Sequence, residues 1–163
     1  MLSAMPTNRR QNHTSPEEGQ IDDVDRRLLG ELQEDARLSL AELGRRIGLS
    51  APAVAERLQR LQSEGVILGY HARIDPHALG LSISAVIRVR PLPRQLQDVA
   101  RIAQESPEVV DCRRITGEDC YVMTAHLRSV EHLEEVIDRF AACGQTTTSI
   151  VQSAPVPRRG LPL

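Results

Sequence analysis

Arg57, Gln59 and Arg60 stand close together near the end of the segment RRIGLSAPAVAERLQRL (45–61). Guanidinium and amide groups donate hydrogen bonds to phosphate oxygens and to the edges of bases. Glu56 could accept from a cytosine amino group, although a glutamate here is also an ordinary solvated helix residue. The formal net charge of -2 does not oppose nucleic-acid binding, because that binding depends on a local positive face. The segment therefore predicts a contact with nucleic acid.

Two helices joined by a tight turn are expected to position these side chains. Ser39 can cap a short helix that Gly48 ends, and Ser50 can cap the helix that follows. An earlier helix begins near Asp22. The apolar stripes that the helices are expected to bury are Val24, Leu28, Leu29 and Leu32, then Leu40, Leu43 and Ile47, then Val54, Leu58 and Leu61. A steep crossing through residues 47–50 makes a helix-turn-helix, which exposes the last helix so that it can enter a major groove.

The face of this last helix that points away from the core follows from a turn of about 100° per residue. It consists of Pro52, Ala53, Glu56, Gln59 and Arg60, with Ala51, Ala55 and Arg57 at its flanks. Small residues at the start of the helix permit close approach to DNA, and a proline in the first turn lacks only an N–H that would be unpaired anyway. The alternative is a three-helix domain without a nucleic-acid role, since short motifs produce false matches.

The second half of the chain has a βαββαβ order of strand and helix patterns. The strands are expected at 82–90, 109–115, 120–127 and 146–153, and the helices at 96–103 and 130–141. This order is typical of a ferredoxin-like α+β fold, in which both helices cover one face of an antiparallel sheet. The uncovered face is expected to carry Ser84, Val86, Arg88, Arg113, Thr124 and His126. Such a half-polar face predicts a homodimer.

Nothing in the sequence indicates a metal site, a cofactor or catalysis. Cys112, Cys120 and Cys143 are odd in number and lack a CxxC spacing, so neither a disulfide framework nor a zinc site is expected. No nucleophile, base and acid set and no phosphate-binding glycine loop appears, so no catalytic residue is assigned. No apolar run is long enough to span a membrane and the start lacks a signal peptide, so we expect a cytoplasmic protein without membrane contact.

Three stretches of the chain carry a resemblance to a known family: residues 21–80, TGEDCYVMTAH (116–126) and TTTSIVQS (146–153). Over about residues 21–155 the chain closely resembles the Lrp/AsnC, or feast/famine, family of bacterial regulators. The resemblance implies a helix-turn-helix joined to a ferredoxin-like effector domain that dimerises, often builds larger rings and in many members senses an amino acid. It also implies that residues 50–60 form the DNA-reading helix and that Arg45 and Arg46 lie near the DNA backbone. The predicted DNA contacts are Arg45, Arg46, Ser50, Ala51, Pro52, Ala53, Glu56, Arg57, Gln59 and Arg60.

The same resemblance assigns the turn formed by Gly117, Glu118 and Asp119 to effector binding between subunits. A zwitterionic amino acid needs acceptors for its ammonium group, which the two acids could supply, and donors for its carboxylate. The candidate donors, besides backbone N–H groups, are Thr146, Thr147, Thr148 and Ser149. The alternative is that TGED is only a favourable hairpin turn and that the threonines only favour a strand. Family members commonly have an aspartate where Cys120 stands, which leaves the identity of the effector open.

The expected function is that of a sequence-specific transcriptional regulator that binds double-stranded DNA and responds to a small effector, expected to be an amino acid, with no other cofactor. The expected partner is a second copy in a homodimer, and assembly beyond the dimer, as a tetramer or an octamer of dimers, is left open. One alternative is an enzyme resembling the siroheme decarboxylases, for which the candidate side chains are His71, His77, His126 and His132. The other is an interaction module that senses metabolites without binding DNA.

The expected domain organisation follows from these patterns and from the resemblance. Residues 1–20 are expected to be a disordered tail, 21–65 a helix-turn-helix domain of winged-helix-like type, 66–80 a linker strand, 81–154 a ferredoxin-like domain for effector binding and oligomerisation, and 155–163 a C-terminal tail.

Overall fold

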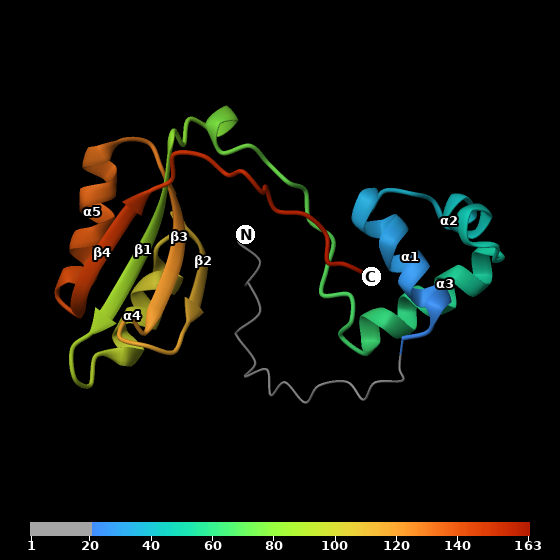
Figure 1. The fold of residues 1–163 in the computed structure, drawn as a ribbon, viewed down its shortest axis with the longest axis horizontal. Helices are drawn as coiled ribbons and strands as arrows, with labels where there is room; N and C mark the ends of the chain where they lie inside the picture. The colour runs from blue at the N-terminus through green and yellow to red at the C-terminus, as the bar shows by residue number, and fades with distance from the viewer. Residues whose placement is uncertain (1–20) are drawn as a thin grey trace, which may run out of the picture. The chain divides into compact units, whose positions relative to one another are not determined.

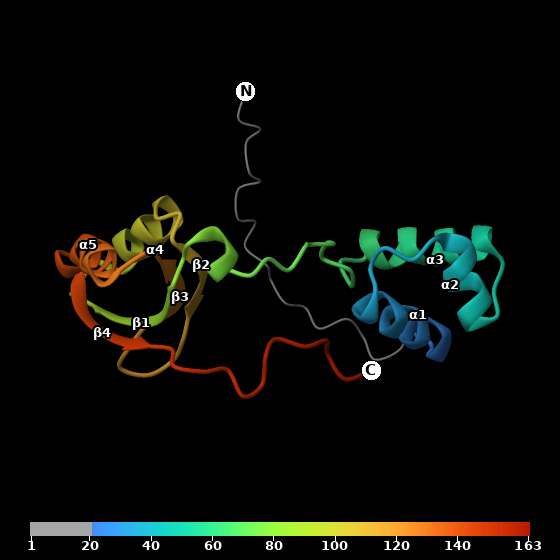
Figure 2. The same ribbon diagram turned by 90° about the horizontal axis from the view of Figure 1, so that it is seen from above.

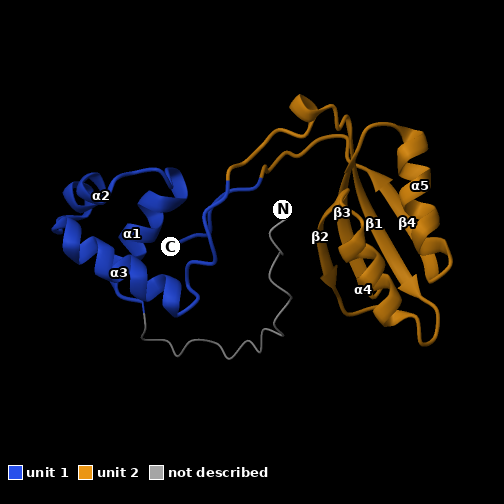
Figure 3. Cartoon of the chain, turned by 180° about the vertical axis from the view of Figure 1, so that it is seen from behind, with its two compact units in different colours: residues 1–71, 158–163 blue, residues 72–157 orange. Residues whose placement is uncertain are grey.

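The computed structural model describes residues 21–163, so the predicted disordered tail (1–20) lies outside the described residues. The chain forms two compact units (Figure 3). Unit 1 comprises the described residues up to His71 together with Arg158–Leu163, and unit 2 comprises Ala72–Pro157. The helix-turn-helix segment and the βαββαβ segment therefore fall in different units. None of the described helices is long and apolar enough to cross a membrane.

The described part of unit 1 is built from helices without a strand. They are α1 (Asp23–Glu34), α2 (Leu40–Ile47) and α3 (Ala51–Ser63) (Figure 1). Each helix begins at a side-chain cap, because an oxygen of Asp22, Ser39 or Ser50 accepts from a backbone N–H three residues later. Gly48 ends α2 in the left-handed conformation, with φ of 80°, which costs little without a Cβ. The predicted caps are confirmed.

The core of unit 1 confirms most of the predicted stripes. Its buried members are Leu28, Leu43, Ile47, Val54 and Leu61, with Val24, Leu29, Leu32 and Leu58 packed against them. Leu40 was expected to point inward but is 41% exposed. The neighbouring residues Ser39 and Ala41 are exposed as well, so the start of α2 lies outside the packed core.

A second glycine supports the turn between α2 and α3, and the sequence patterns did not single it out. A Cβ added at Gly44 would collide with the carbonyl oxygen of Leu49. The carbonyl of Gly44 also accepts from the N–H groups of Gly48 and Leu49, at 2.8 and 2.9 Å. The close backbone approach that lets α3 begin here therefore depends on glycine at both positions.

The predicted linker strand at 66–80 is not observed in the described chain. Val66 and Ile67 donate to the carbonyl of Leu61, at 2.9 and 3.0 Å, and pack against the core of unit 1. The rest of the segment has no strand, and its only regular element is the 3₁₀ helix η1 (His77–Leu79). A β-prone composition is not sufficient for a strand, because the backbone groups also need a partner strand, and no segment of the described chain supplies one.

Unit 2 has the expected ferredoxin-like fold. Its elements are β1 (Ile83–Pro91), α4 (Leu96–Glu105), β2 (Val109–Arg114), β3 (Tyr121–Leu127), α5 (Val130–Ala141) and β4 (Gly144–Ile150). The sheet has the order β2-β3-β1-β4 and all its pairs are antiparallel. Both helices lie on the same side of the sheet (Figure 2). The last strand starts and ends earlier than the predicted 146–153.

Strand alternation sets the two faces of this sheet. Ala85, Ile87 and Val89 of β1 are buried between the sheet and the helices, together with Met123 and Ala125 of β3 and Phe140 of α5. Their neighbours in the chain point to the opposite face, which none of the described helices of unit 2 covers. In the register of the sheet, Val86 lies opposite Thr124 and Ser84 opposite His126, so the uncovered face is mixed in polarity, as predicted.

Candidate nucleic-acid interface and effector site

The beginning of α3 carries small residues and its outer face carries polar ones. Ser50 accepts from the N–H of Ala53 at 3.4 Å. Pro52, Glu56 and Gln59 are exposed, as the helical pattern predicted. An open hollow of about 600 Å³ lies beside this face, lined from α1 and from α3 and the turn before it. Small side chains and exposed amide and carboxylate groups suit close approach to a groove.

Arg57 and Arg60 are not loose side chains on this face, because both reach α1. Arg57 bonds to Asp22 at 2.7 Å and to Asp25 at 2.8 Å, and Arg60 bonds to the other oxygen of Asp25 at 2.6 Å. Asp25 is 0% exposed, whereas the two arginines remain partly open to solvent. The helical pattern placed Arg60 on the outer face and Arg57 at its flank, and it did not predict that carboxylates at the start of α1 hold both.

The electrostatics of Asp25 follow from this arrangement. Burial alone would raise the pKa of its carboxyl, but hydrogen bonds from Arg60 and Arg57 outweigh burial and hold the pKa below its ordinary value. The Asp25 carboxylate also accepts from the N–H of Asp22 at 3.1 Å, which completes a capping box with the bond from Asp25 N–H to Asp22. One charged group thus closes the start of α1 and anchors α3.

Asp25 was missed by the sequence analysis, although a signal was present. It precedes Leu28 by three residues, which places an acid on the apolar stripe of α1. A buried charge needs partners, so an arginine from another helix could have been expected.

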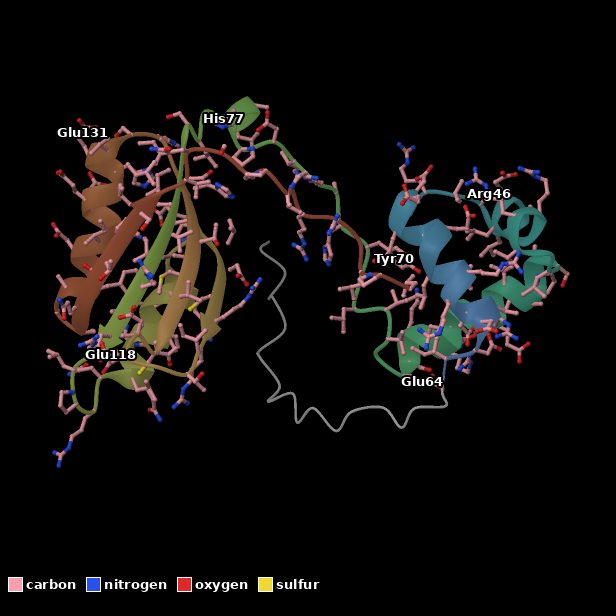
Figure 4. All side chains as sticks on the ribbon, in the orientation of Figure 1. Arg46, Glu64, Tyr70, His77, Glu118 and Glu131 are labelled. Carbon is pink, nitrogen blue, oxygen red and sulfur yellow. The ribbon has the colours of Figure 1, made fainter. Side chains whose placement is uncertain are left out.

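Arg45 and Arg46 lie in the last turn of α2 and share an acid. Arg45 bonds to Glu42 at 2.6 Å, and Arg46 bonds to Glu42 and to Glu31 of α1, each at 2.8 Å. Hydrogen bonds from Arg45 and then Arg46 lower the pKa of Glu42 to about 2. Arg45 keeps 72% of its side chain exposed, and Arg46 is at the outer edge of unit 1 (Figure 4). Both guanidinium groups remain accessible to a phosphate.

The predicted effector turn connects β2 to β3. Gly117 has a φ of 109°, a conformation that favours glycine. Glu118 projects into solvent with 83% of its side chain exposed and pairs with Arg90 at the end of β1 (Figure 4). Asp119 lies 4.0 Å from the Nε of the same arginine. Arg90 was not among the predicted residues, because only the pairing of β1 with β3 brings it to this loop.

The four predicted residues of the last strand do not lie together. Thr147 is paired with Arg88 and Ser149 with Val86, so both lie on the uncovered face. Thr146 and Thr148 alternate with them and lie on the helix side, where the hydroxyl oxygen of Thr148 is buried without a hydrogen bond in the described chain. Ser149 is also four strand residues, about 13 Å, from the loop end of the sheet. Within one chain, only part of this set can approach the loop.

The four histidines proposed for an enzyme do not form one group, because His126 and His132 line a common hollow of unit 2 and His71 and His77 do not. His71 and His77 lie in the segment between α3 and β1, where no strand forms. His126 contacts Ser84 at 2.8 Å, and His132 contacts Glu108 at 2.9 Å. Among the described residues, no group of three or more histidine, cysteine or acidic side chains could hold a metal ion.

Two family models match the chain in the two regions just described. Residues 21–62 match the AsnC-type helix-turn-helix domain, and residues 84–161 match the Lrp/AsnC ligand binding domain. The first match contains α1, α2 and α3, and the second contains the sheet with its two helices.

Relatives and solved structures agree with these models. The HTH-type transcriptional regulator LrpA of Mycobacterium tuberculosis is 40% identical over 129 residues, which cover 78% of this chain and 86% of the relative. The structure of Bacillus subtilis LrpC superposes with a TM-score of 0.81 at 33% identity and covers 85% of this chain and 99% of its own. The feast or famine regulatory protein of M. tuberculosis complexed with L-methionine gives a TM-score of 0.80 at 36% identity, over 86% of this chain and 97% of its own.

These findings set aside the enzyme and the DNA-free module as alternatives, because the family models and the named relatives describe regulators. The chain belongs to the Lrp/AsnC family and is a DNA-binding transcriptional regulator with a helix-turn-helix domain and a ligand-binding domain.

Proposed function

We propose that the effector of this regulator is an amino acid, and that it binds at the loop end of the uncovered sheet face. The single observation that carries this proposal is the position of Arg90 against Glu118 and Asp119. A cationic and two anionic groups at one spot match the two charges of a zwitterion.

The binding chemistry is an exchange of partners. The effector carboxylate replaces Glu118 on Arg90, and the freed carboxylate together with Asp119 receives the ammonium group. The Arg90–Glu118 pair is exposed to solvent, so opening it costs little. Thr147 shares the uncovered face and is the candidate donor from the last strand. Ser149 lies on the same face but about 13 Å from the loop end, and Thr146 and Thr148 face the helices and have a structural role. The complex of the M. tuberculosis relative with L-methionine supports an amino acid as the ligand class.

The regulator acts on double-stranded DNA through α3. The start of α3, with the cap residue Ser50 and then Ala51, Pro52 and Ala53, approaches the groove, and the exposed Glu56 and Gln59 meet base edges. Phosphates are bound by the four arginines, Arg45, Arg46, Arg57 and Arg60. A homodimer through the uncovered sheet face presents two such helices to a pseudo-palindromic site, and higher assemblies, as a tetramer or an octamer of dimers, extend the same arrangement.

Effector control requires different affinities for at least two states of the assembly. An amino acid held at the margin of a dimer-forming face can stabilise one assembly over another and so change the spacing of the two reading helices. The effector therefore changes DNA affinity without touching DNA.

Fluorescence anisotropy tests this proposal on the full chain. The protein is titrated onto duplex DNA from its own upstream region and onto a scrambled duplex, at two salt concentrations, with and without a pool of amino acids. We expect salt-sensitive preference for the upstream duplex and a shift of that binding by the pool.

A matched pair of variants assigns the site. Asp119→Asn should abolish the response to the pool while leaving DNA binding intact, and Asp98→Asn, on the outer surface of α4, should change neither. An unaltered response in the Asp119→Asn protein would overturn the site, and a duplex preference that no amino acid alters would overturn the effector class.

A further inference from the structure

A second hollow lies at the other end of the sheet of unit 2. It follows the end of β3, whereas the effector loop precedes the start of that strand, and the seven residues of β3 separate the two sites by about 20 Å. The hollow has a volume of about 220 Å³ and one apolar wall formed by Leu81, Pro107 and Val110. Its polar wall contains His126, Arg128 and His132. The volume lies below the usual range for drug-sized ligands, which favours a small occupant.

Glu108, the only acid among the described residues that line the hollow, already has its charge balanced by arginine. Both oxygens of Glu108 accept from Arg139, at 2.9 and 3.1 Å, and one also contacts Nε2 of His132 at 2.9 Å. Hydrogen bonds from Arg139, against the opposing effect of burial, lower the pKa of Glu108 to about 2. The carboxylate is therefore charged but occupied, and it is not available to balance a further cation or to receive an ammonium group.

Among the described residues that line the hollow, Arg128 is a cation whose charge no acid balances. Its backbone contacts His132 and Ser82, but its guanidinium makes no ion pair or hydrogen bond within residues 21–163. Beside it, Nδ1 of His126 lies 2.8 Å from the hydroxyl of Ser84. When that hydroxyl donates, Nε2 of the imidazole carries the proton and is a donor in its turn. Two donors, one of them charged, thus share a hollow with an apolar wall.

We propose that this hollow binds a small aliphatic carboxylate, held by Arg128 and His126 with its hydrocarbon part against Leu81, Pro107 and Val110. A guanidinium matches the planar carboxylate geometry. An amino acid fits less well, because its ammonium group would meet donors and find the one acid occupied. Inorganic phosphate fits less well because it gains nothing from the apolar wall. The site is thus chemically distinct from the zwitterion site at Gly117, Glu118 and Asp119.

Equilibrium dialysis of the full-length protein with radiolabelled pentanoate tests the proposal. We expect saturable binding of about one pentanoate per chain, competed by unlabelled pentanoate and not by uncharged pentanamide. Arg128→Gln should weaken the affinity by roughly tenfold or more, the usual effect of losing a charge-assisted hydrogen bond. His126→Gln should weaken it less, since it removes a neutral donor.

Two control variants distinguish binding in this hollow from binding elsewhere on the protein. Arg101→Gln, on α4 and outside the lining, and Asp119→Asn, at the effector loop, should both retain pentanoate binding. The proposal is overturned by absence of saturable binding to the wild-type protein, by equal losses in the Arg128 and Arg101 variants, or by loss in the Asp119 variant. Competition by phosphate as effective as that by pentanoate would also overturn it, because the apolar wall would then have no role.

Discussion

Asp25 in unit 1 and Glu118 in unit 2 both pair with arginine, but in opposite surroundings. Asp25 is fully buried and holds two guanidinium groups from α3. Glu118 is 83% exposed and holds one, that of Arg90. A buried pair is costly to break because one charge is left without solvent, whereas an exposed pair exchanges readily with water or with a ligand.

The difference in burial suits the two tasks. In the proposed function, Arg57 and Arg60 are on a helix that enters a groove, and the carboxylate of Asp25 limits their conformational freedom before DNA binds. In the same proposal, Arg90 accepts a ligand carboxylate in place of Glu118. The proposal thus gives the same pair of residue types two uses: in unit 1 the acid orients arginines before DNA binds, and in unit 2 the arginine exchanges its acid for a ligand.

The largest expected effect comes from removing the buried acid of this comparison. Asp25→Ala should lower the free energy of unfolding by about 3 kcal/mol, because it deletes two ion pairs and half of the capping box while the arginines lose their anchor. Urea unfolding followed by circular dichroism measures the change. Asp23→Ala, an exposed acid in the same turn of α1, is the control. If the Asp25→Ala protein unfolded at the same urea concentration as the wild type, the ion pairs of Asp25 would not contribute to stability.

Glu108 extends the comparison, since it is a nearly buried acid within unit 2. Its pKa falls from 4.5 to about 2 in the folded protein, so the stabilisation that it provides is complete above about pH 4.5 and is lost as the pH falls toward 2. The free energy of unfolding of the wild-type protein should therefore be about 2 kcal/mol higher than that of Glu108→Gln near neutral pH. The two values should become equal in acid.

The measurement is the free energy of unfolding of both proteins from pH 7 down to about pH 2. Glu105→Gln, at the exposed end of α4, provides the matched comparison and should follow the wild-type curve. If the free energies of unfolding of Glu108→Gln and wild type differed by the same amount at every pH, the substitution would act through packing and not through the charge of Glu108.

Arg60, on the other side of the buried pair, should affect both folding and DNA binding, because its removal leaves the buried Asp25 with one arginine fewer. Arg60→Ala should weaken binding to the cognate duplex about tenfold, because one phosphate contact is lost. For the same reason, the slope of the logarithm of the binding constant against the logarithm of salt concentration should decrease by about one. Anisotropy at several salt concentrations reports both quantities, and circular dichroism verifies that the variant is folded. Arg37→Ala, exposed before α2, is the control. Unchanged affinity and slope would exclude Arg60 from the interface.

The smallest expected effect concerns the exposed acid. Glu118→Gln should leave the urea midpoint of the protein unchanged, since an exposed pair contributes little to stability, while it weakens the response of DNA binding to amino acids. The urea midpoint and the anisotropy response are measured on the same preparation. A large shift of the midpoint would contradict the contrast with Asp25.

Local features of this protein could be predicted because their causes are local. Ser39 and Ser50 cap helices through bonds to backbone groups three residues away, and Gly48 ends α2 through its own backbone conformation. The alternation of polar and apolar residues in β1 likewise predicts which side chains face the helices, because this alternation does not depend on the partner strand. Strand prediction from local composition failed at segment 66–80, because no partner strand pairs with this β-prone segment in the described chain.

The sequence by itself determined the helix-turn-helix, the βαββαβ order and the acidic turn at 117–119, because each depends on residues that are close together in the chain. Only the tertiary structure decided that Asp25 lies beneath Arg57 and Arg60, that Arg90 meets Glu118, and that the threonines of the last strand divide between two faces. The physical reason is distance along the chain. These contacts join residues 28 to 35 positions apart, so the crossing of helices and the register of strands must be set before the side chains can meet.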